Sequence, residues 1–506
     1  MLTVTNGANF DWGNMPLSDM AFGCAMDCDF TLRAWNILKE DINKLHLNHV
    51  YDNLLKSIVV TLAKVEYTGI KVDKKYLAVL EDLLSENLAS LVEEINELNP
   101  LDDDINPNST AHVGTVLFTS EGFGLTATEF SAKTKKPSIT ESHLTDLLEK
   151  SKKAKVKEFI LKLLEYKSKS KLYKTYVKGV ESSIEWNDDG RIYSSYNFAA
   201  TVTGRLSCSQ YSAGNGMRKG VSFHTLPRPT EDNVNIRKLM ISDTDKVFIA
   251  ADYSQAELRV LAQCCKDENL LEAFNSGVDL HRFTASLVFG KEASEVTKEE
   301  RQIAKSVSFL IVYGGGPHKL SQQIGESIGY CKGIFKAYQD SYPKVFSWIK
   351  FVHKYIRENE HAVSLFGRRR NLPNVSSPIR KYQFRALRQG MNFVIQSSAS
   401  DMMLQGILGL EEALKASGVD AQILASVHDS VEIQCAKSDT KQVLELVKSC
   451  LTDTTAFKGF YNLDFAVPFE VDVEVGNSFG DATEAHFDDV GQLTNLNNIL
   501  DYVENQ

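Results

Sequence analysis

The stretch VFIAADYSQAELRVLAQ, residues 247–263, changes from a strand pattern to a helix pattern within a few residues. Residues 247–251 form an almost wholly apolar run typical of a buried strand, and from Ala256 the apolar residues recur at helical spacing. Asp252 lies at the junction, at the tip of the strand. Because burying an unpaired carboxylate is costly, we expect Asp252 to have a partner or a chemical role.

The composition is that of an ordinary globular protein. The chain has 506 residues, 43% of them hydrophobic and 24% charged, which suffices for several domains or one large multi-lobed enzyme. No apolar run approaches the roughly 18 residues that cross a bilayer, and we expect no secretion signal at the N-terminus. The cysteines include no CxxC pair, which favours reduced thiols in a cytoplasmic protein over a zinc site.

The net charge of −10 would argue against a nucleic-acid partner if the charge were evenly spread, but it is segregated. Residues 149–178 carry eleven lysines and only three glutamates, and their spacing predicts a helix. Such a run is either a solvated helix face or a surface that follows a phosphate backbone. The run alone does not decide between these two interpretations.

The pattern along the chain predicts helical lobes around a small sheet. Residues 50–69 and 73–98 are expected to be helices, the second with Asp73 as its N-cap. Further along, the pattern predicts a strand in residues 190–198, a flexible basic loop at 208–222, mostly helices at 256–410 and strands near the end. This order favours an α+β fold over a doubly wound one.

A second acid ends another predicted strand. In AQILASVHDSVEIQC, residues 421–435, two β-like runs flank His428, Asp429 and Ser430, which predicts a tight hairpin with Asp429 at its tip. If both strands belong to one sheet, Asp252 and Asp429 lie close together and repel unless a cation sits between them. Oxygen ligands of this kind suit Mg²⁺. The alternative for either residue is an ordinary surface acid in a turn.

A helix predicted in RQIAKSVSFLIVYGGG, residues 301–316, has two distinct faces. One slanting stripe consists of Arg301, Lys305, Phe309 and Tyr313, which recur every four residues. The apolar face consists of Ile303, Val307, Leu310 and Ile311. Two cations followed by two rings match the order of phosphates, sugar and base in a nucleoside triphosphate. No GxxxxGK[ST] loop occurs, so side chains and metal would hold the phosphates.

A polar stripe of Arg388, Asn392 and Gln396 follows the same four-residue spacing. In the minor groove of a duplex every Watson–Crick pair offers a purine N3 and a pyrimidine O2 acceptor at similar positions. Donors placed there could sense pairing geometry without reading sequence. The alternative is an exposed helix with polar residues at this interval.

Together these segments resemble the family A DNA polymerases, the bacterial polymerase I group and its phage relatives. The matching motifs are DYSQAELR (252–259), RQIAKSVSFLIVYG (301–314), VHDS (427–430), TGRLS (203–207), DLHRFTASLVFG (279–290), FGRRRNLP (366–373) and RQGMNFVIQ (388–396). They occur in the family's order and cover roughly residues 15–480.

The resemblance implies an α+β right-hand fold with a small antiparallel palm sheet and helical fingers and thumb. The expected parts are an exonuclease-like remnant (1–45), a palm-associated helix (46–75), the thumb (76–178), the first part of the palm (179–260), the fingers (261–380) and the second part of the palm (381–506). The lysine-rich helix would then lie in the thumb, against the duplex backbone.

The resemblance also assigns roles to individual residues. Two Mg²⁺ ions, with Mn²⁺ as a substitute, would be held by Asp252, Asp429 and the backbone carbonyl of Tyr253. The catalytic residues would be Asp252, Asp429 and Lys305, the last as general acid for pyrophosphate. The nucleotide would be bound by Arg301, Lys305, Phe309, Tyr313, His281, Gln255 and Glu257. The primer–template would be contacted by Arg205, Arg388, Asn392, Gln396 and His428.

The activity implied is template-directed addition of dNTPs to a primer 3′-hydroxyl by two-metal-ion nucleotidyl transfer, with release of pyrophosphate. We expect a role in phage or other viral DNA replication in the host cytoplasm, with primer–template DNA and dNTPs as partners and no membrane association. Two alternatives are a catalytically inactive primer–template-binding accessory subunit and a single-subunit RNA polymerase. The intact set Asp252, Asp429 and Lys305 argues against the first, and Glu257 argues against the second.

The sequence departs from the family pattern at several positions. Ser430 stands where a third acid is usual, and His224 and Thr225 stand where an amide pair is usual. Leu310 replaces a common glycine. The pair Gly315–Gly316 is expected to loosen the end of the 301–313 helix.

Residues 16–35 resemble the last helix of a 3′–5′ exonuclease domain, with Asp27 matching its final metal acid. The part of that domain upstream of this helix, including the DxE pair that the chemistry needs, is absent, so we expect no proofreading by this chain. Either proofreading is lost, or a separate exonuclease chain supplies it. A separate processivity subunit is a further expected partner.

Overall fold

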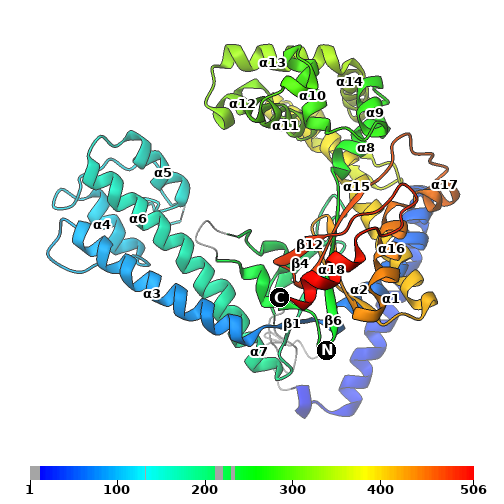
Figure 1. Cartoon of the computed structure of the whole chain (residues 1–506), viewed down its shortest axis with the longest axis horizontal. Coiled ribbons are helices and arrows are strands. Elements are labelled where there is room, and N and C mark those ends of the chain that lie inside the picture. The colour runs from blue at the N-terminus through cyan, green and yellow to red at the C-terminus, as the bar shows by residue number, and fades with distance from the viewer. Residues whose placement is uncertain (1–11, 132, 211–219, 230–233, 506) are drawn as a thin grey trace. The chain divides into compact units, whose positions relative to one another are not determined.

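The computed structural model describes residues 12–131, 133–210, 220–229 and 234–505 (Figure 1). The chain forms two compact units. Unit 1 comprises Met1–Val59, Glu257–Asp401 and Thr454–Val467, and unit 2 comprises Val60–Ala256, Met402–Asp453 and Pro468–Gln506. Among the described residues, no helix is both long and apolar enough to span a bilayer. All eight cysteines are free thiols.

Unit 2 is built on an antiparallel sheet, which within the described residues has eight strands in the order β2-β1-β5-β11-β6-β10-β9, with β12 paired to β11. The strands are β1 (Ile70–Val72), β2 (Arg191–Ile192), β5 (Met240–Ile241), β6 (Lys246–Tyr253), β9 (Ala421–Val427), β10 (Ser430–Ala436), β11 (Val471–Ser478) and β12 (Asp481–Glu484). Strand β6 lies between β11 and β10, and its apolar run is buried as predicted.

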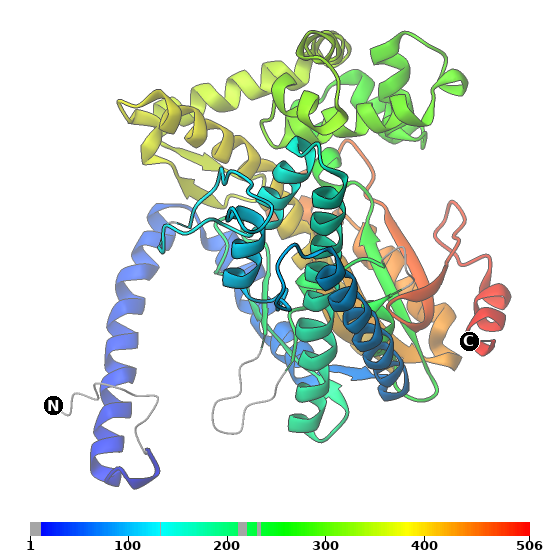
Figure 2. The same ribbon diagram turned by 90° about the vertical axis from the view of Figure 1, so that its left-hand side faces the viewer.

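The helices of unit 2 pack beside this sheet and in a separate helical bundle. They are α3 (Lys74–Leu98), α4 (Thr110–Phe118), α5 (Glu141–Lys150), α6 (Ala154–Lys171), α7 (Lys178–Asn187), α16 (Thr440–Thr452) and α18 (Leu496–Glu504). Helices α3 and α6 run side by side around a buried apolar cluster that includes Leu91, Phe159 and Leu163 (Figure 2). The predicted N-cap is confirmed, because the Asp73 carboxylate accepts hydrogen bonds from the backbone N–H groups of Lys75 and Tyr76.

The structure corrects three local expectations in unit 2. The lysine-rich helix is interrupted at residues 151–153, between α5 and α6, and passes through a π-helical turn at Leu172–Val177 before α7. Residues 190–198 form two short strands, β2 and β3 (Ser194–Asn197), in different sheets. The expected loop at 208–222 begins as strand β4 (Ser207–Gln210), which pairs with β3, and its residues 211–219 lie outside the described part.

Unit 1 is mainly helical, as predicted for this part of the chain. Its elements are α1 (Leu17–Lys44), α8 (Ala256–Cys265), α9 (Glu268–Asn275), α10 (Leu280–Phe289), α11 (Lys298–Val312), α12 (Pro317–Ile324), α13 (Ile328–Ser341), α14 (Pro343–Asn359), α17 (Thr455–Tyr461) and a hairpin of β7 (His361–Val363) and β8 (Arg369–Asn371). Helices α2 (Lys56–Thr68) and α15 (Arg380–Ser417) are divided between the two units, and the first residue of α8 falls in unit 2.

Helix α1 coincides with the helix expected at residues 16–35 and extends beyond it. No described residue of α1 is buried. Several of its large apolar side chains are exposed to solvent: Leu17, Phe22, Phe30, Leu32, Ile37 and Leu38.

Helix α15 contains a close contact that ties it to strand β6. A Cβ atom at Gly406 would lie 2.5 Å from the hydroxyl oxygen of Tyr253, which donates a hydrogen bond to the Leu451 carbonyl. Gly406→Ala should therefore destabilise the protein by about 1–3 kcal/mol, despite alanine's higher helix propensity. The midpoint of urea unfolding measures this change.

Gly409 is the matched control, because it lies in the same helix and nothing stands within 4 Å of an added Cβ. Gly409→Ala should raise stability by up to about 1 kcal/mol. Equal effects of the two substitutions would contradict the packing assigned to Tyr253.

Candidate functional site

The pairing of β10 with β6 brings the two predicted acids to neighbouring strand ends. Strands β9 and β10 form a hairpin whose two-residue turn is His428–Asp429, and Ser430 at the start of β10 lies opposite Asp252. The backbone N–H of Tyr253 donates to the Asp429 carbonyl at 3.1 Å. His428 has φ 58°, a left-handed conformation that non-glycine residues rarely adopt, so the turn is sharply constrained.

Asp252 is surrounded by other acids. It is exposed at the strand tip, although most other residues of β6 are buried. Desolvation by the surrounding protein, followed by the negative charges of Asp429, Asp472 and Glu474, raises the pKa of Asp252 to about 6. Asp472 lies opposite Asp252 on β11. The Asp252 carboxylate is therefore not fully buried, and the neighbouring acids repel its negative charge.

This arrangement fits a divalent cation, because a cation between the acids would remove the repulsion that raises the pKa. Among the described residues, no group of three or more His, Cys, Asp and Glu side chains is arranged to hold a metal. The chain would therefore offer two carboxylates and the Tyr253 carbonyl, and would leave other coordination positions to water or substrate, as Mg²⁺ sites commonly do.

Basic groups surround the Asp429 turn. The Nη2 atom of Arg205 lies 3.6 Å from Asp429 Oδ1. His428 is exposed, and its ring centroid lies 4.9 Å from that of His224. His224 donates from Nε2 to the Ser426 carbonyl at 3.0 Å; burial, and then the nearby His428, lower its pKa to about 4, so it is neutral at pH 7. The sequence did not identify this supporting role of His224.

Helix α11 in unit 1 presents the predicted stripe. Thr297 and Glu300 form a capping box at its N-terminus. Of the predicted apolar face, Val307, Leu310 and Ile311 are buried and Ile303 is partly buried. Arg301, Lys305 and Phe309 lie on the other face, whereas Tyr313 lies just beyond the last helical residue and is half exposed.

The end of α11 corrects an expectation. Gly315 and Gly316 lie outside the helix and do not loosen it. Gly314 has φ 64°, its N–H donates to the Ile311 carbonyl, and the N–H of Gly315 donates to the Leu310 carbonyl, which is the Schellman pattern of a firmly closed helix end. A Cβ on Gly315 would lie 2.7 Å from a Leu310 methyl carbon, so Leu310 requires this glycine.

Arg301 is held by an acid that the sequence did not identify as part of the site. The Nε of Arg301 donates to both carboxylate oxygens of Asp279 at 3.1 Å, and its Nη2 donates to Oδ2 at 2.6 Å. Asp279 also caps α10 by accepting from the backbone N–H of Arg282. The pattern of Asp before an apolar run signals such a cap, but not the pairing with Arg301.

His281 on α10 is a further predicted residue near Arg301 and Lys305. It is buried, and desolvation, the largest cause, lowers its pKa to about 4, with the nearby Lys305 and Arg301 charges also lowering it. Its ring centroid lies 6.1 Å from that of Phe309, and its Nδ1 has no hydrogen-bond partner among the described residues. The α10–α11 pair therefore gathers two cations, a neutral imidazole and a ring.

The second predicted stripe lies on α15. Arg388 is exposed, and Asn392 and Gln396 are half-buried. The Arg388 side chain lies over Gly314, where an added Cβ would come within 2.8 Å of it, and Asn392 Nδ2 donates to the Val312 carbonyl at 3.5 Å. The stripe thus contacts the closed end of α11 within unit 1.

The link between β6 and α8 carries two further predicted residues. Gln255 adopts a positive φ of 54°, and its Oε1 is shielded from solvent and accepts no hydrogen bond from the described residues. Glu257 is buried in the first turn of α8.

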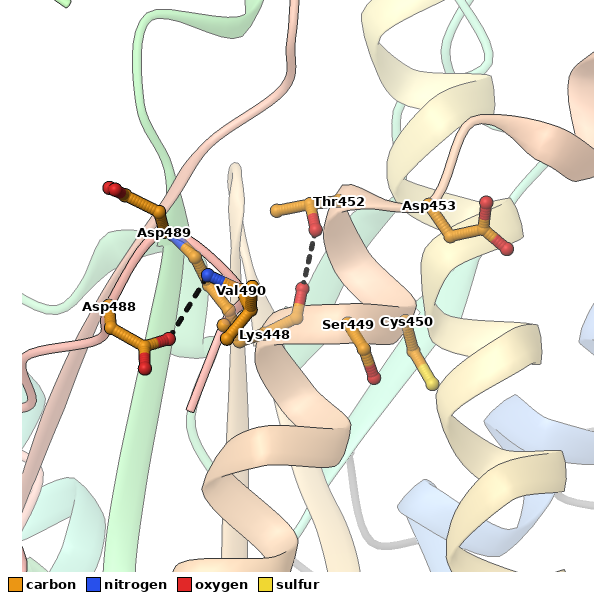
Figure 3. A pocket seen from close by; sticks show the side chains of 9 residues that line it. Lys448, Ser449, Cys450, Thr452, Asp453, Asp488, Asp489 and Val490 are labelled. Carbon is orange, nitrogen blue, oxygen red and sulfur yellow. Dashed lines mark hydrogen bonds between the residues drawn. The ribbon is translucent and has the colours of Figure 1, made fainter. Parts of the chain in front are cut away.

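A hollow of about 550 Å³ lies elsewhere in unit 2 (Figure 3). It is lined by the end of α16 and residues 488–491. Asp488 there accepts a hydrogen bond from the backbone of Val490. None of the predicted site residues lines this hollow.

Comparisons with known proteins agree on one family. The family model described as DNA polymerase family A matches residues 74–481. Over 435 residues the chain is 32% identical to the thermostable DNA polymerase I of Thermus aquaticus, covering 86% of this chain and 49% of that protein. Over 459 residues it is 29% identical to DNA polymerase I of Pseudomonas aeruginosa, covering 90% and 47%. The chain thus spans about half the length of these relatives.

A solved structure gives the fold. The POL domain of Pol1 from M. smegmatis, in complex with DNA primer-template and dNTP, matches with a TM-score of 0.77 and 27% identity, covering 89% of this chain and 74% of that one. The right-hand polymerase fold of α+β class that the sequence predicted is therefore confirmed.

If Asp252 holds a divalent cation, its raised pKa makes that binding pH-dependent. A proton and a divalent cation compete for this carboxylate, so the affinity for Mn²⁺ should fall about tenfold between pH 7 and pH 5 as Asp252 becomes protonated. Electron paramagnetic resonance of free Mn²⁺ measures the affinity.

Asp472→Asn removes one of the negative charges near Asp252, so the fall in Mn²⁺ affinity should move to lower pH. Asp489→Asn, which lies in the separate hollow, should leave the pH of this fall unchanged. An affinity unchanged between pH 7 and pH 5, or a profile indifferent to Asp472→Asn, would contradict the electrostatic account of Asp252.

Proposed function

Because the chain belongs to DNA polymerase family A, we propose that it is a template-directed DNA polymerase that adds dNTPs to a primer 3′-hydroxyl and releases pyrophosphate. The observation that carries the proposal is the register of β6 and β10, which sets Asp252 and Asp429 at adjacent strand ends.

Asp252, Asp429 and the Tyr253 carbonyl would hold two Mg²⁺ ions, or Mn²⁺ in their place. When bound, such ions activate the attacking hydroxyl and stabilise the leaving pyrophosphate. Arg205, 3.6 Å from Asp429, would balance the charge of this carboxylate and contact the primer terminus together with the exposed His428.

The α10–α11 group would bind the triphosphate. Arg301 and Lys305 supply positive charge, and neutral His281 can donate one hydrogen bond to a phosphate oxygen. Lys305 would give its proton to the departing pyrophosphate. Asp279 would hold Arg301 in place until the phosphates compete for the guanidinium.

The remaining roles concern the sugar, base and duplex. Phe309 would pack on the incoming nucleotide and Tyr313 would lie beside the templating base. Gln255 and Glu257 would line the sugar, with Glu257 closing the space next to C2′. Arg388, Asn392 and Gln396 would follow the minor groove of the primer–template.

We assign residues 76–178 to the thumb, 179–260 and 381–506 to the palm and 261–380 to the fingers. The lysines of α6 would then follow the duplex backbone without sequence preference. The segments 1–45 and 46–75 would be the exonuclease-like remnant and the palm-associated helix.

We also place the enzyme in phage or viral DNA replication, in the cytoplasm of the host. The chain itself would not proofread, since its resemblance to an exonuclease domain is carried by one helix, on which Asp27 is exposed. Either proofreading would be lost or a separate exonuclease chain would supply it, and a processivity subunit would be a further partner.

Asp429→Asn tests the proposed function. It removes one of the two charges that would hold the ions, so primer extension with Mg²⁺ and four dNTPs should fall by about a thousandfold, while primer–template affinity stays near that of the unchanged protein. Asp489→Asn is the control and should extend normally. Extension by the Asp429→Asn protein at the normal rate would refute the catalytic assignment.

Glu257→Ala tests the discrimination of sugars. Removing this buried side chain opens space beside C2′, so incorporation of ribonucleotides should rise by roughly tenfold or more relative to dNTPs. Glu257→Gln keeps the volume and should still exclude them, and Glu272→Ala on α9 controls for loss of an exposed acid. If Glu257→Ala leaves the ratio of ribonucleotide to dNTP incorporation unchanged, another residue must exclude ribonucleotides.

A further inference from the structure

Glu432 on β10 is an acid that no step above uses. It is fully buried, at 0% exposure, although isolated glutamates rarely are. Its position two residues after Ser430 puts both side chains on the sheet face of Asp252, since Ser430 lies opposite Asp252 and Glu432 lies opposite Ala250. Its Oε1 lies 2.6 Å from Ser430 Oγ, and its Oε2 has no hydrogen-bond partner among the described residues.

Ser430 has two acceptors within reach but only one proton. Its Oγ lies 3.0 Å from the Val427 carbonyl and 2.6 Å from Glu432 Oε1. If Glu432 were a carboxylate, the single Ser430 proton could be donated either to Glu432 Oε1 or to the Val427 carbonyl, but not to both at once. If Glu432 is a carboxylic acid, its O–H donates to Ser430 and the Ser430 O–H donates to the Val427 carbonyl. The protonated form therefore lets Ser430 bond to Glu432 and to the Val427 carbonyl at the same time.

The surroundings of Glu432 favour the protonated form. Asp252 on β6 and Glu474 on β11 face it with negative charge, and Arg237 faces it with positive charge. Arg237 is also engaged by the Pro227 carbonyl at 3.3 Å and by the Phe479 ring at 4.8 Å. Burial dominates these effects and raises the pKa of Glu432 to about 8.

The chain of hydrogen bonds ends at the turn that carries Asp429. Val427 is the last residue of β9, directly before His428–Asp429. We propose that Glu432 is a positioning residue: as a buried acid it donates to Ser430, and Ser430 in turn fixes the Val427 carbonyl, so that the turn presents Asp429 in one place beside Asp252. This inference rests on the proposed function, because it concerns where a catalytic carboxylate is held.

Two substitutions of similar size separate the donated hydrogen bond from simple filling of space. Glu432→Gln keeps a donor for Ser430 and should retain kcat within about threefold, whereas Glu432→Leu lacks the donor and should lower kcat at least tenfold. The KM for dNTP and the affinity for primer–template should stay the same in both. If Glu432 only filled space in the core, Glu432→Gln would not retain a higher kcat than Glu432→Leu.

Hydrogen exchange at the hairpin peptide, residues 424–434, gives a readout that does not need polymerase activity. Exchange should be faster in Glu432→Leu and Ser430→Ala and unchanged in Glu432→Gln. Gln434→Leu is the control: Gln434 is buried on the same face two residues further from the turn, so it should not change exchange at residues 427–430.

The two proposals fail in different ways. An unchanged chain that extends no primer refutes the proposed function, and hydrogen exchange still decides the role of Glu432. Normal kcat and normal exchange in Glu432→Leu would overturn the inference. So would equal damage by glutamine and leucine, because the carboxyl group itself would then be required.

Discussion

The antiparallel pairing of β6 with β10 is the constraint on which the rest of the site depends. Its register places the Asp429 turn at the end of β6, where the charges of Asp252 and Asp429 repel. The fold tolerates this repulsion because the same strands bury large apolar side chains: Ile249, Val431 and Ile433 have no exposed surface. At roughly 25 cal/mol per Å² of apolar surface, each such side chain stabilises the sheet by about 2 kcal/mol. A bound cation would remove the repulsion without altering the strands.

In unit 1, as in the sheet of unit 2, buried apolar side chains fix the element that carries the candidate functional residues. Helix α11 buries Val307, Leu310 and Ile311 on one side, so its cations lie on a face fixed by packing. The Schellman end at Gly314 and Gly315 stops the helix at a defined residue and supports Arg388 of α15. Polar groups in both units are held by hydrogen bonds to their neighbours. Asp279 orients Arg301, and the Ser430–Glu432 pair holds the His428–Asp429 turn. Preorganisation of this kind lowers the cost of ordering side chains when substrate binds.

Much of the fold could be predicted because local signals agreed with the tertiary structure. The Asp73 cap, the strand–helix junction at Asp252 and the two faces of α11 all follow from spacing and residue type. The break at residues 151–153 was missed because lysines and apolar residues continue through it at helical spacing. The roles of Asp279, His224 and Glu432 depend on contacts between segments far apart in the chain or on burial. Glu432 in particular sits in an alternating strand, where a polar residue is normally assigned to the solvent face.

The central claim is that Asp252 and Asp429 share divalent ions at the polymerase site. The most direct measurement is anomalous diffraction from crystals of the chain grown with primer–template, a non-hydrolysable dNTP analogue and Mn²⁺. The account predicts an anomalous peak within about 2 Å of carboxylate oxygens from both residues at once. Mn²⁺ bound by only one of the two carboxylates, or found only at another group, would contradict it.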